Sequence, residues 1–256
     1  MYHFFGDAPA HGDPKGLFVS EQALADQLGW LGRRGWNPLT LTEFLAALDG
    51  APTPRRSYLF TIDDGHESAM RIAAPALAAA GVPSVLFVPS GLLGGPPSWT
   101  EDYASERLLD ASELRAVAAT GMEIGVHGFD HARMWDMTPD ELERNTVHAR
   151  RVLSDAGIVA RSYAYPYGTW DGPARRAVAG SGYDAAFAVA REGGRFALDR
   201  VGVYAHDSMP TFRFKLSFPY RVVLRIAGRT WRLRHLVRDA LATARPHTRV
   251  GRRVDA

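Results

Sequence analysis

The chain has 256 residues, enough for one large domain or two small ones. Its apolar share of 46% and charged share of 23% are typical of an ordinary globular protein, which excludes wholesale disorder, collagen and a simple coiled coil. No run reaches the roughly 18 consecutive apolar residues that would predict a membrane-spanning helix. Cysteine is absent, so any metal must be bound by His, Asp or Glu.

The net charge of +2 is unevenly distributed. Residues 213–256 hold 12 Arg+Lys and 2 Asp+Glu, whereas the preceding 212 residues hold 18 and 26. An acidic body is therefore followed by a strongly basic segment. The first seven residues lack the basic and then apolar plan of a signal peptide, so we expect a cytoplasmic protein.

Apolar periodicity and breaker residues predict alternating helices and strands along the body. Thr42, Ser112 and Thr138 are the expected N-caps of three of the helices. The alternation predicts a parallel sheet, either doubly wound or closed into a barrel. We expect helices over residues 17–35, 42–48, 69–80, 112–121, 138–156 and 172–180, and strands over 57–62, 84–88, 122–126, 162–165, 185–189 and 201–204.

The basic segment favours a helix with an apolar stripe flanked by arginines. Such a helix can lie on an anionic membrane surface, or it can pack against the acidic body, which is the interpretation we favour. No recognised nucleic-acid-binding module accompanies the charge, so we expect no nucleic-acid partner. The apolar positions of the stripe are Ile226, Leu233, Val237 and Leu241.

Three polar clusters follow three of the predicted strands, at the point where each strand ends. In parallel α/β folds the carboxyl ends of the strands are where ligands and catalytic groups collect. Each cluster alone fits an ordinary turn or a pair of surface histidines, but three in succession indicate a site. The clusters are Asp63-Asp64-Gly65, His127-Gly128-Phe129-Asp130-His131 and Pro166-Tyr167-Gly168.

The side chains of these clusters fit metal-assisted hydrolysis. Two adjacent carboxylates can take different tasks, one binding a metal and the other acting as a base beside it. His127 and His131, four residues apart, are expected on one face of a helical turn, where they can bind one ion together. With Asp64 they give three ligands and an open position for water, which is the pattern of catalytic zinc.

The ordered set of motifs resembles the polysaccharide deacetylase family (carbohydrate esterase family four, the nodulation-type chitooligosaccharide deacetylase domain). It is most similar to the branch whose third motif reads Ala-Tyr-Pro-Tyr-Gly. The resemblance covers residues 1–217 and leaves 218–256 as a basic, helical and partly disordered C-terminal extension. It implies an α/β fold, a distorted (β/α) barrel with a parallel sheet of about seven strands. The motifs are Thr61-Ile62-Asp63-Asp64-Gly65, His127-Gly128-Phe129-Asp130-His131 and Ala164-Tyr165-Pro166-Tyr167-Gly168.

The resemblance also implies an activity, the metal-dependent hydrolysis of N-acetyl groups on amino sugars such as N-acetylglucosamine. Asp63 matches the catalytic base, which takes a proton from metal-bound water. Asp64, His127 and His131 match the ligands of zinc, which cobalt or another divalent ion replaces in some members. Tyr167 matches the position whose backbone N–H helps to hold the oxyanion of the tetrahedral intermediate.

Two departures from the family pattern affect the expected catalytic groups. Many members carry an arginine at the position of Ala164 that orients the catalytic aspartate, and Arg200 is the expected substitute. Many members also end with a Leu-x-His motif whose histidine is the general acid. His206 is the candidate for that catalytic role, and a surface loop position is the competing interpretation. His3, at a strand start, is expected either near the site or as a buried, hydrogen-bonded residue, and the second interpretation is the one we favour.

Substrate-binding positions are expected around the third motif. Pro166 and Gly168 shape the turn that carries Tyr167. Trp170, Trp99 and Trp135 are near the motifs and are candidates to stack on sugar rings, and core or rim packing is the slightly favoured competing interpretation for each. His66 follows the first motif and is a candidate to touch substrate, but an ordinary loop position is the favoured interpretation.

Two other functions fit the same residues less well. One is hydrolysis of another acyl or imide bond, such as an O-acetyl ester or a cyclic amide, on the same fold. The other is a non-catalytic glycan-binding barrel, which has no need for a complete set of base and metal ligands. The sequence leaves open the physiological metal, the oligomeric state and whether the carbohydrate substrate is a polymer, a lipid-linked sugar or a small glycosylated metabolite.

Overall fold

The computed structural model describes residues 1–189, 193–217 and 219–220. The chain divides into two compact units, Met1–Ala205 and His206–Ala256. The boundary expected after residue 217 therefore falls inside the second unit, and nearly all of the expected basic extension lies outside the described residues. Within the described ranges, no helix has the length and apolar character needed to cross a membrane.

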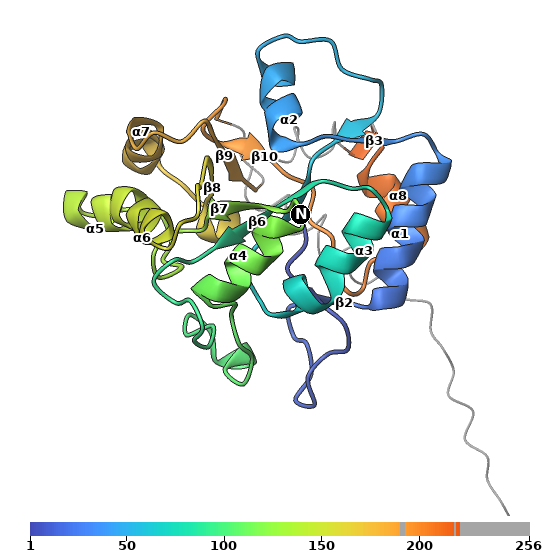
Figure 1. Cartoon of the computed structure of the whole chain (residues 1–256), viewed down its shortest axis with the longest axis horizontal. Helices are drawn as coiled ribbons and strands as arrows, with labels where there is room; N and C mark the ends of the chain where they lie inside the picture. The colour runs from blue at the N-terminus through green and yellow to red at the C-terminus, as the bar shows by residue number, and fades with distance from the viewer. Residues whose placement is uncertain (190–192, 218, 221–256) are drawn as a thin grey trace, which may run out of the picture. The chain divides into compact units, whose positions relative to one another are not determined.

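Six parallel strands form the main sheet of the first unit, in the spatial order β10-β9-β8-β7-β6-β5 (Figure 1). The short pairs β1-β2 and β3-β4 are also parallel. The strands are β1 (Phe4–Phe5), β2 (Phe18–Val19), β3 (Asn37–Pro38), β4 (Ser57–Tyr58), β5 (Phe60–Ile62), β6 (Ser84–Val88), β7 (Glu123–Val126), β8 (Ser162–Ala164), β9 (Ala185–Ala188) and β10 (Leu198–Asp199).

The N-terminal residues complete the sheet between its two edges. Tyr2 pairs in parallel with Ile62 of β5, and the Tyr2 carbonyl accepts a hydrogen bond from Asp63 N at 2.9 Å. On the other side, Val203 N donates to the Met1 carbonyl at 2.9 Å, directly after β10. A strand was predicted over 201–204, but this segment makes single backbone contacts with Met1 instead. The result is a distorted (β/α) barrel with six regular strands where about seven were expected.

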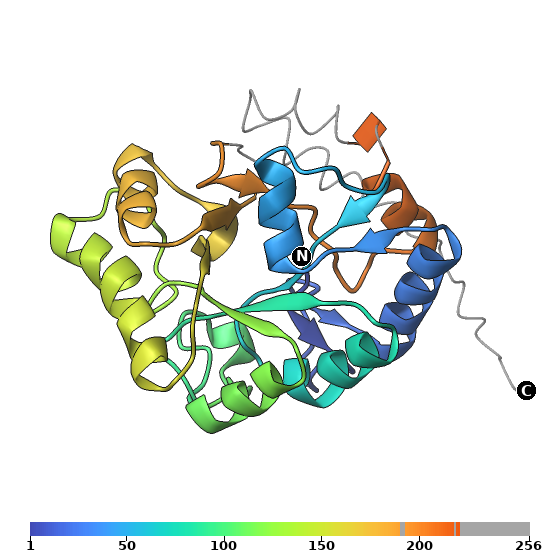
Figure 2. The same cartoon turned by 45° about the horizontal axis from the view of Figure 1, so that its top comes forward.

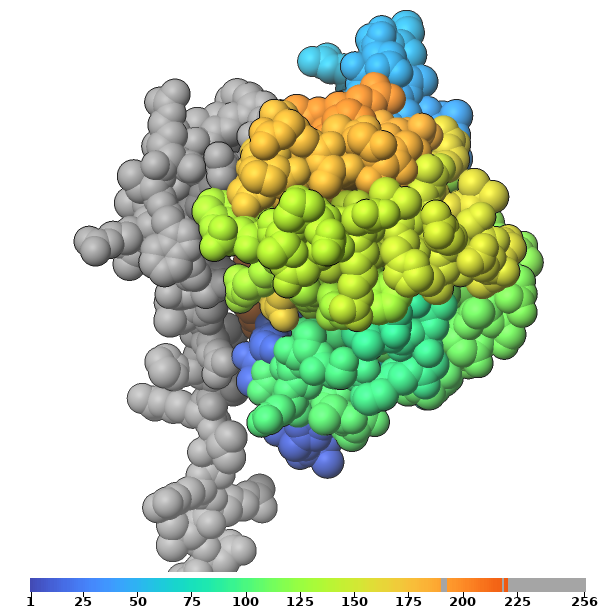
Figure 3. Space-filling model, turned by 90° about the vertical axis from the view of Figure 1, so that its left-hand side faces the viewer, coloured from blue at the N-terminus to red at the C-terminus, as the bar shows by residue number. Residues whose placement is uncertain are grey.

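Helices surround the outer face of the curled sheet, which is typical of a βα-repeat fold (Figure 2). On one side of the first unit, α5, α6 and α7 form neighbouring ridges (Figure 3). The helices are α1 (Glu21–Arg33), α2 (Leu41–Leu48), α3 (Ala74–Ala79), α4 (Ala111–Ala119), α5 (Pro139–Glu143), α6 (Ala149–Asp155) and α7 (Gly172–Gly180), with π-helical turns η1 (Ala69–Ala73) and η3 (Arg144–His148) and 3-10 turns η2 (Glu101–Tyr103) and η4 (Pro166–Gly168).

Two of the expected helix caps are wrong by two residues. Thr40, not Thr42, caps α2, because its hydroxyl accepts from Glu43 N while the Glu43 carboxylate accepts from Thr40 N. Asp110, not Ser112, caps α4 through the same reciprocal pair of hydrogen bonds, here with Glu113. The cap at Thr138 is confirmed, with proline at the first helical position.

The interior of the barrel is apolar where α2 meets the sheet. Leu41 and Leu45 of α2 pack with Val85 and Phe87 of β6 and with Phe187 of β9. Burial of such a side chain contributes about 1.5–3 kcal/mol. This core fixes the strands, and their carboxyl ends then carry the polar clusters at one edge.

The described part of the second unit contains helix α8 (Met209–Lys215). Ser208 caps the helix by accepting a hydrogen bond from Thr211 N. The buried Lys215 ammonium pairs with the buried Asp207 carboxylate. Burial lowers the pKa of Lys215, and the Asp207 charge opposes that shift.

Candidate active site

The first and second polar clusters meet as their strand positions predict. Asp63 and Asp64 follow β5, His127 follows β7, and all three side chains are buried although all are ionisable. His131 joins them from the loop after β7 and is also buried, at 4% exposure. Buried ionisable groups are costly unless they are paired or bind a metal.

Asp63 is held by a buried arginine that follows the strand at the other edge of the sheet. Arg200, just after β10, donates from Nη1 to Asp63 Oδ1 and from Nη2 to Asp63 Oδ2, both at 2.7 Å. Two parallel bonds of this kind fix the orientation of a carboxylate as well as its charge. The contact that a substitute for the arginine missing at Ala164 needs is therefore present, and the role of Arg200 in orienting a catalytic aspartate stays a prediction.

Asp64, His127 and His131 bring together a compact set of atoms that could bind a metal ion. His127 Nε2 lies 3.4 Å and His131 Nε2 lies 3.2 Å from Asp64 Oδ1. One ligand atom from each residue lies within 4.8 Å of the other two. His127 Nδ1 lies 2.8 Å from the Ala164 carbonyl, which can only accept, so Nδ1 carries the proton and Nε2 is free to bind a metal.

The charges in the site are strongly coupled. Burial raises the pKa of Asp63, but the Arg200 and His127 charges outweigh it and hold that pKa below its usual value. Burial also opposes ionisation of Asp64, yet hydrogen bonds from His127 and His131 place its pKa well below the usual range. Burial lowers the pKa of His131, whereas in His127 the two carboxylates prevail over burial and raise it. Both carboxylates are therefore ionised at neutral pH.

The loop that carries the two histidines is not the helical turn that their spacing predicted. Gly128 and His131 have positive φ angles of 76° and 59°, which an α-helical turn does not allow. Asn145, buried in the π-helical turn η3, shapes the loop instead: its Oδ1 accepts from Phe129 N at 2.9 Å. π-helical turns such as η3 are frequent at functional sites. Nothing in the sequence pattern predicts this one.

The third cluster forms a tight turn beside His131. Tyr167 adopts a left-handed backbone with φ 57° and ψ 7°, between the buried residues Pro166 and Gly168. The Tyr167 ring lies 4.7 Å from the His131 ring, edge to face. The structure therefore brings Tyr167 to the metal-ligand set, and Pro166 and Gly168 shape the turn as expected.

Gly168→Ala is expected to destabilise the protein and displace this turn. Gly168 has φ 66°, and an added Cβ would lie 2.4 Å from Val189 Cβ and 2.6 Å from Val189 N. Gly35 has the same φ of 66° with nothing within 4 Å of an added Cβ, so Gly35→Ala isolates the backbone strain. We expect ~1–2 kcal/mol from Gly35→Ala and about 2–5 kcal/mol from Gly168→Ala in denaturant unfolding. Equal losses in the two variants would show that Val189 yields to the added atom.

His3 lies at the site, which is the less favoured of the two positions expected for it. The parallel register that sets Tyr2 beside Ile62 places His3 next to Asp63. Its Nδ1 is buried and has no hydrogen-bond partner among the described residues. Burial lowers the pKa of His3, and the Asp64 and Asp63 charges oppose that shift.

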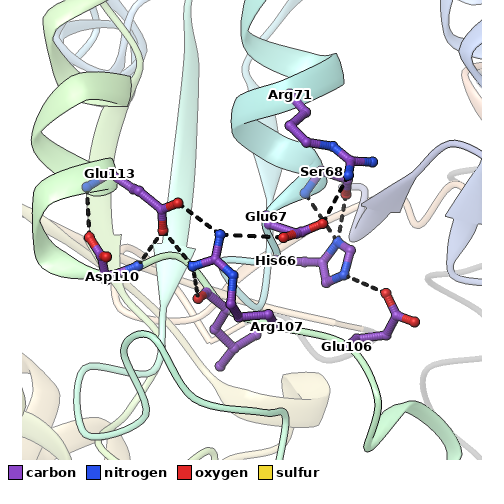
Figure 4. Close-up of polar contacts among 9 residues, drawn as sticks. His66, Glu67, Ser68, Arg71, Glu106, Arg107, Asp110 and Glu113 are labelled. Carbon is purple, nitrogen blue, oxygen red and sulfur yellow. Dashed lines mark hydrogen bonds and ion pairs between the residues drawn. The ribbon is translucent and has the colours of Figure 1, made fainter.

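His66 is a buried anchor of the first motif, not the ordinary loop residue expected. Its Nδ1 lies 2.7 Å from Ser68 Oγ and its Nε2 lies 3.0 Å from Glu106, as Figure 4 shows. Ser68 Oγ in turn accepts from Phe5 N at 2.9 Å. The adjacent Glu67 pairs with Arg107. These bonds fix the turn after Asp64 relative to the N-terminal strand.

The aromatic candidates occupy different environments. The Trp99 ring stacks on the His131 imidazole, with centroids 4.1 Å apart and 22° between the planes. Trp135 is 56% exposed. Trp170 is 7% exposed and packs near Tyr165, so the prediction that it binds substrate gains no support from the structure. His206 is exposed and belongs to the second unit, and its role as general acid stays a prediction.

Comparison with known proteins gives one family. Residues 50–186 match the family model "Polysaccharide deacetylase". The Bacillus subtilis protein YxkH is 23% identical over 210 residues, covering 79% of this chain and 70% of that protein. The poly-beta-1,6-N-acetyl-D-glucosamine N-deacetylase of Escherichia coli is 29% identical over 103 residues, 40% of this chain and 14% of that protein.

Solved structures share the fold. The Streptococcus pyogenes deacetylase PplD, in complex with acetate, superposes with a TM-score of 0.72 at 18% identity, covering 85% of this chain and 96% of that one. IcaB from Ammonifex degensii gives a TM-score of 0.70 at 22% identity, covering 84% and 95%. The distorted (β/α) barrel expected from the sequence is thus confirmed.

Proposed function

The chain belongs to the polysaccharide deacetylase family, and on that premise we propose that it is a metal-dependent hydrolase that removes N-acetyl groups from an amino-sugar-containing glycan or glycoconjugate. The observation that carries the proposal is the buried Asp64–His127–His131 set beside a separate buried carboxylate, Asp63. A glycan-binding barrel has no use for this arrangement, which is costly to bury.

The three ligand residues fit a divalent cation of the zinc type. Two imidazole nitrogens and one carboxylate oxygen are its preferred donors, and three protein ligands leave a position open for chemistry. The carbonyl of Ala164 fixes the tautomer that His127 needs. A bound cation would polarise the acetamide carbonyl and lower the pKa of a water molecule at the open position. Zinc is the proposed cation, and cobalt is the alternative.

Asp63 is proposed to act as the base that takes a proton from the attacking water. Its two oxygens are held by Arg200, so the carboxylate keeps one orientation as the proton arrives. The Arg200 charge also lowers the pKa of Asp63, which keeps the carboxylate ionised and able to accept a proton at neutral pH. Arg200 is in this account a positioning residue.

Two further groups are proposed to complete the reaction. Tyr167 has a left-handed backbone. Its backbone N–H is proposed to donate a hydrogen bond to the acetamide oxygen, which would stabilise the negative charge on that oxygen. The donor of a proton to the leaving amine stays the sequence-based candidate His206, because burial lowers the pKa of His3 and leaves that imidazole neutral at neutral pH. A cytoplasmic location and contact of the basic tail with a membrane surface stay predictions.

The proposed function is tested by acetate release. The purified chain is treated with a chelator, divided, and one part is reconstituted with zinc and another with cobalt. β-1,4- and β-1,6-linked N-acetylglucosamine oligosaccharides are then supplied, and free acetate and free amine are measured. We expect equal amounts of both products from the reconstituted chain and at least a hundredfold less from the chelated chain. Acetate release that is insensitive to chelation would reject the metal-dependent mechanism.

A further inference from the structure

An exposed arginine lies on the aromatic rim of the active site. The Arg133 guanidinium stands 4.3 Å from the centre of the Tyr167 ring, and that ring lies 4.7 Å from the His131 ring. The Tyr167 side chain is 43% exposed. The Trp99 ring also contacts His131, by stacking on its imidazole. A continuous path of ring contacts therefore leads from a metal ligand to a cation at the surface.

Arg133 has no acidic partner in the part of the chain that the structure describes. The nearby Arg144 pairs with Asp130 at 3.6 Å, and Arg200 pairs with Asp63. Arg133 instead makes a cation–π contact with Tyr167, which orients the guanidinium and leaves its N–H groups without a carboxylate.

The charge balance of the site makes this arginine unusual. Asp63, Asp64 and Arg200 together carry one negative charge, which a divalent cation would turn into one positive charge. Arg133 adds a second positive charge at the rim of a body that is otherwise acidic, with 18 basic and 26 acidic residues before position 213. A rim of one sign concentrates ligands of the opposite sign.

We propose that Arg133, held on the Tyr167 ring, is a subsite for an oxyanion of the substrate, a phosphate or carboxylate close to the acetylated amino sugar. This inference rests on the proposed function and narrows it from neutral glycans to anionic glycoconjugates. A planar guanidinium binds either oxyanion through two parallel N–H bonds. Of the two sources, the test distinguishes a phosphoryl group from a carboxyl group.

The test compares binding in a background that does not turn over. Asp63→Asn and Asp63→Asn/Arg133→Gln, both loaded with zinc, are titrated by calorimetry with N-acetylglucosamine, N-acetylglucosamine 1-phosphate and N-acetylmuramic acid. An anion that contacts the cation directly does so in both proteins, so the ratio between them isolates Arg133. Arg151→Gln, which removes an exposed arginine of α6, is the matched control.

We expect Arg133→Gln to weaken binding of at least one anionic sugar about tenfold, the loss of one charge-assisted pair, with binding of the neutral sugar unchanged. Weaker binding of N-acetylglucosamine 1-phosphate alone assigns a phosphoryl subsite. An equal loss of affinity for the phosphate and for N-acetylmuramic acid assigns a site for either oxyanion. The control should bind all three sugars like its parent. Equal changes for neutral and anionic sugars, or no change for any, would overturn the proposal.

Failure of the subsite and failure of the proposed function give different results. Binding is measured without turnover, so a chain that releases no acetate from any sugar still reports the effect of Arg133. Conversely, acetate release from neutral and anionic sugars with equal kcat/KM in wild type and Arg133→Gln keeps the deacetylase and rejects the subsite. Arg133→Lys adds a further check, because a lysine keeps the charge and loses the two-pronged geometry.

Discussion

Asp63→Asn is expected to lower kcat by about a hundredfold to ten-thousandfold and to leave the bound cation in place. The amide of asparagine cannot take a proton from water, whereas the three ligand residues are untouched. The change also leaves the buried Arg200 without its anionic partner. Some loss of stability is therefore expected as well. Thermal unfolding measures that loss independently of kcat.

A matched control is available one loop away. Asp130 lies between the two histidine ligands in sequence, is partly exposed and pairs with Arg144 at 3.6 Å. Asp130→Asn removes a carboxylate from the same region without touching the proposed base, so we expect kcat within a few-fold of wild type. Activity of Asp63→Asn within tenfold of wild type, with metal retained, would show that Asp63 is not the base.

The parallel sheet and two of the candidate metal ligands, Asp64 and His127, could be predicted because they follow from local patterns. The strand at 57–62 and the carboxylates after it come from one short apolar run and its end. His127 follows a strand in the same way. Because parallel strands end at the same edge, the sequence alone brings Asp64 and His127 together.

Other parts of the site depend on contacts that no local pattern encodes. His131 reaches the set through a left-handed backbone that Asn145 supports from a different helix, so its spacing from His127 suggested a helical turn that does not exist. His3 joins the site only because Tyr2 pairs with Ile62, some sixty residues along the chain. Such pairings are decided by the closure of the whole sheet.

Arg200 could be predicted from the sequence as a partner of Asp63, but the direction of its side chain could not. Its position at the start of the last predicted strand suggested a replacement for the arginine missing at Ala164, but not the two 2.7 Å bonds to Asp63. The guanidinium lies 5.5 Å from the Phe87 ring centre and 5.9 Å from that of Phe187. Packing of these rings inside the barrel therefore sets its direction.

The metal content of the purified chain tests the central claim most directly. Elemental analysis is made of wild type, Asp64→Ala, His127→Ala and the control His148→Ala, an exposed histidine of η3. Asp64→Asn, which keeps the side-chain shape, guards against a variant that fails to fold, and thermal unfolding is recorded for each protein. One of three ligands is lost in each ligand variant.

We expect about one zinc or similar ion per chain in wild type and in His148→Ala, and less than about a tenth of that in the three ligand variants. That result would establish the buried triad as the metal site on which the proposed hydrolysis depends. No metal in folded wild type after addition of zinc or cobalt, or full metal content in folded Asp64→Ala and His127→Ala, would contradict the account.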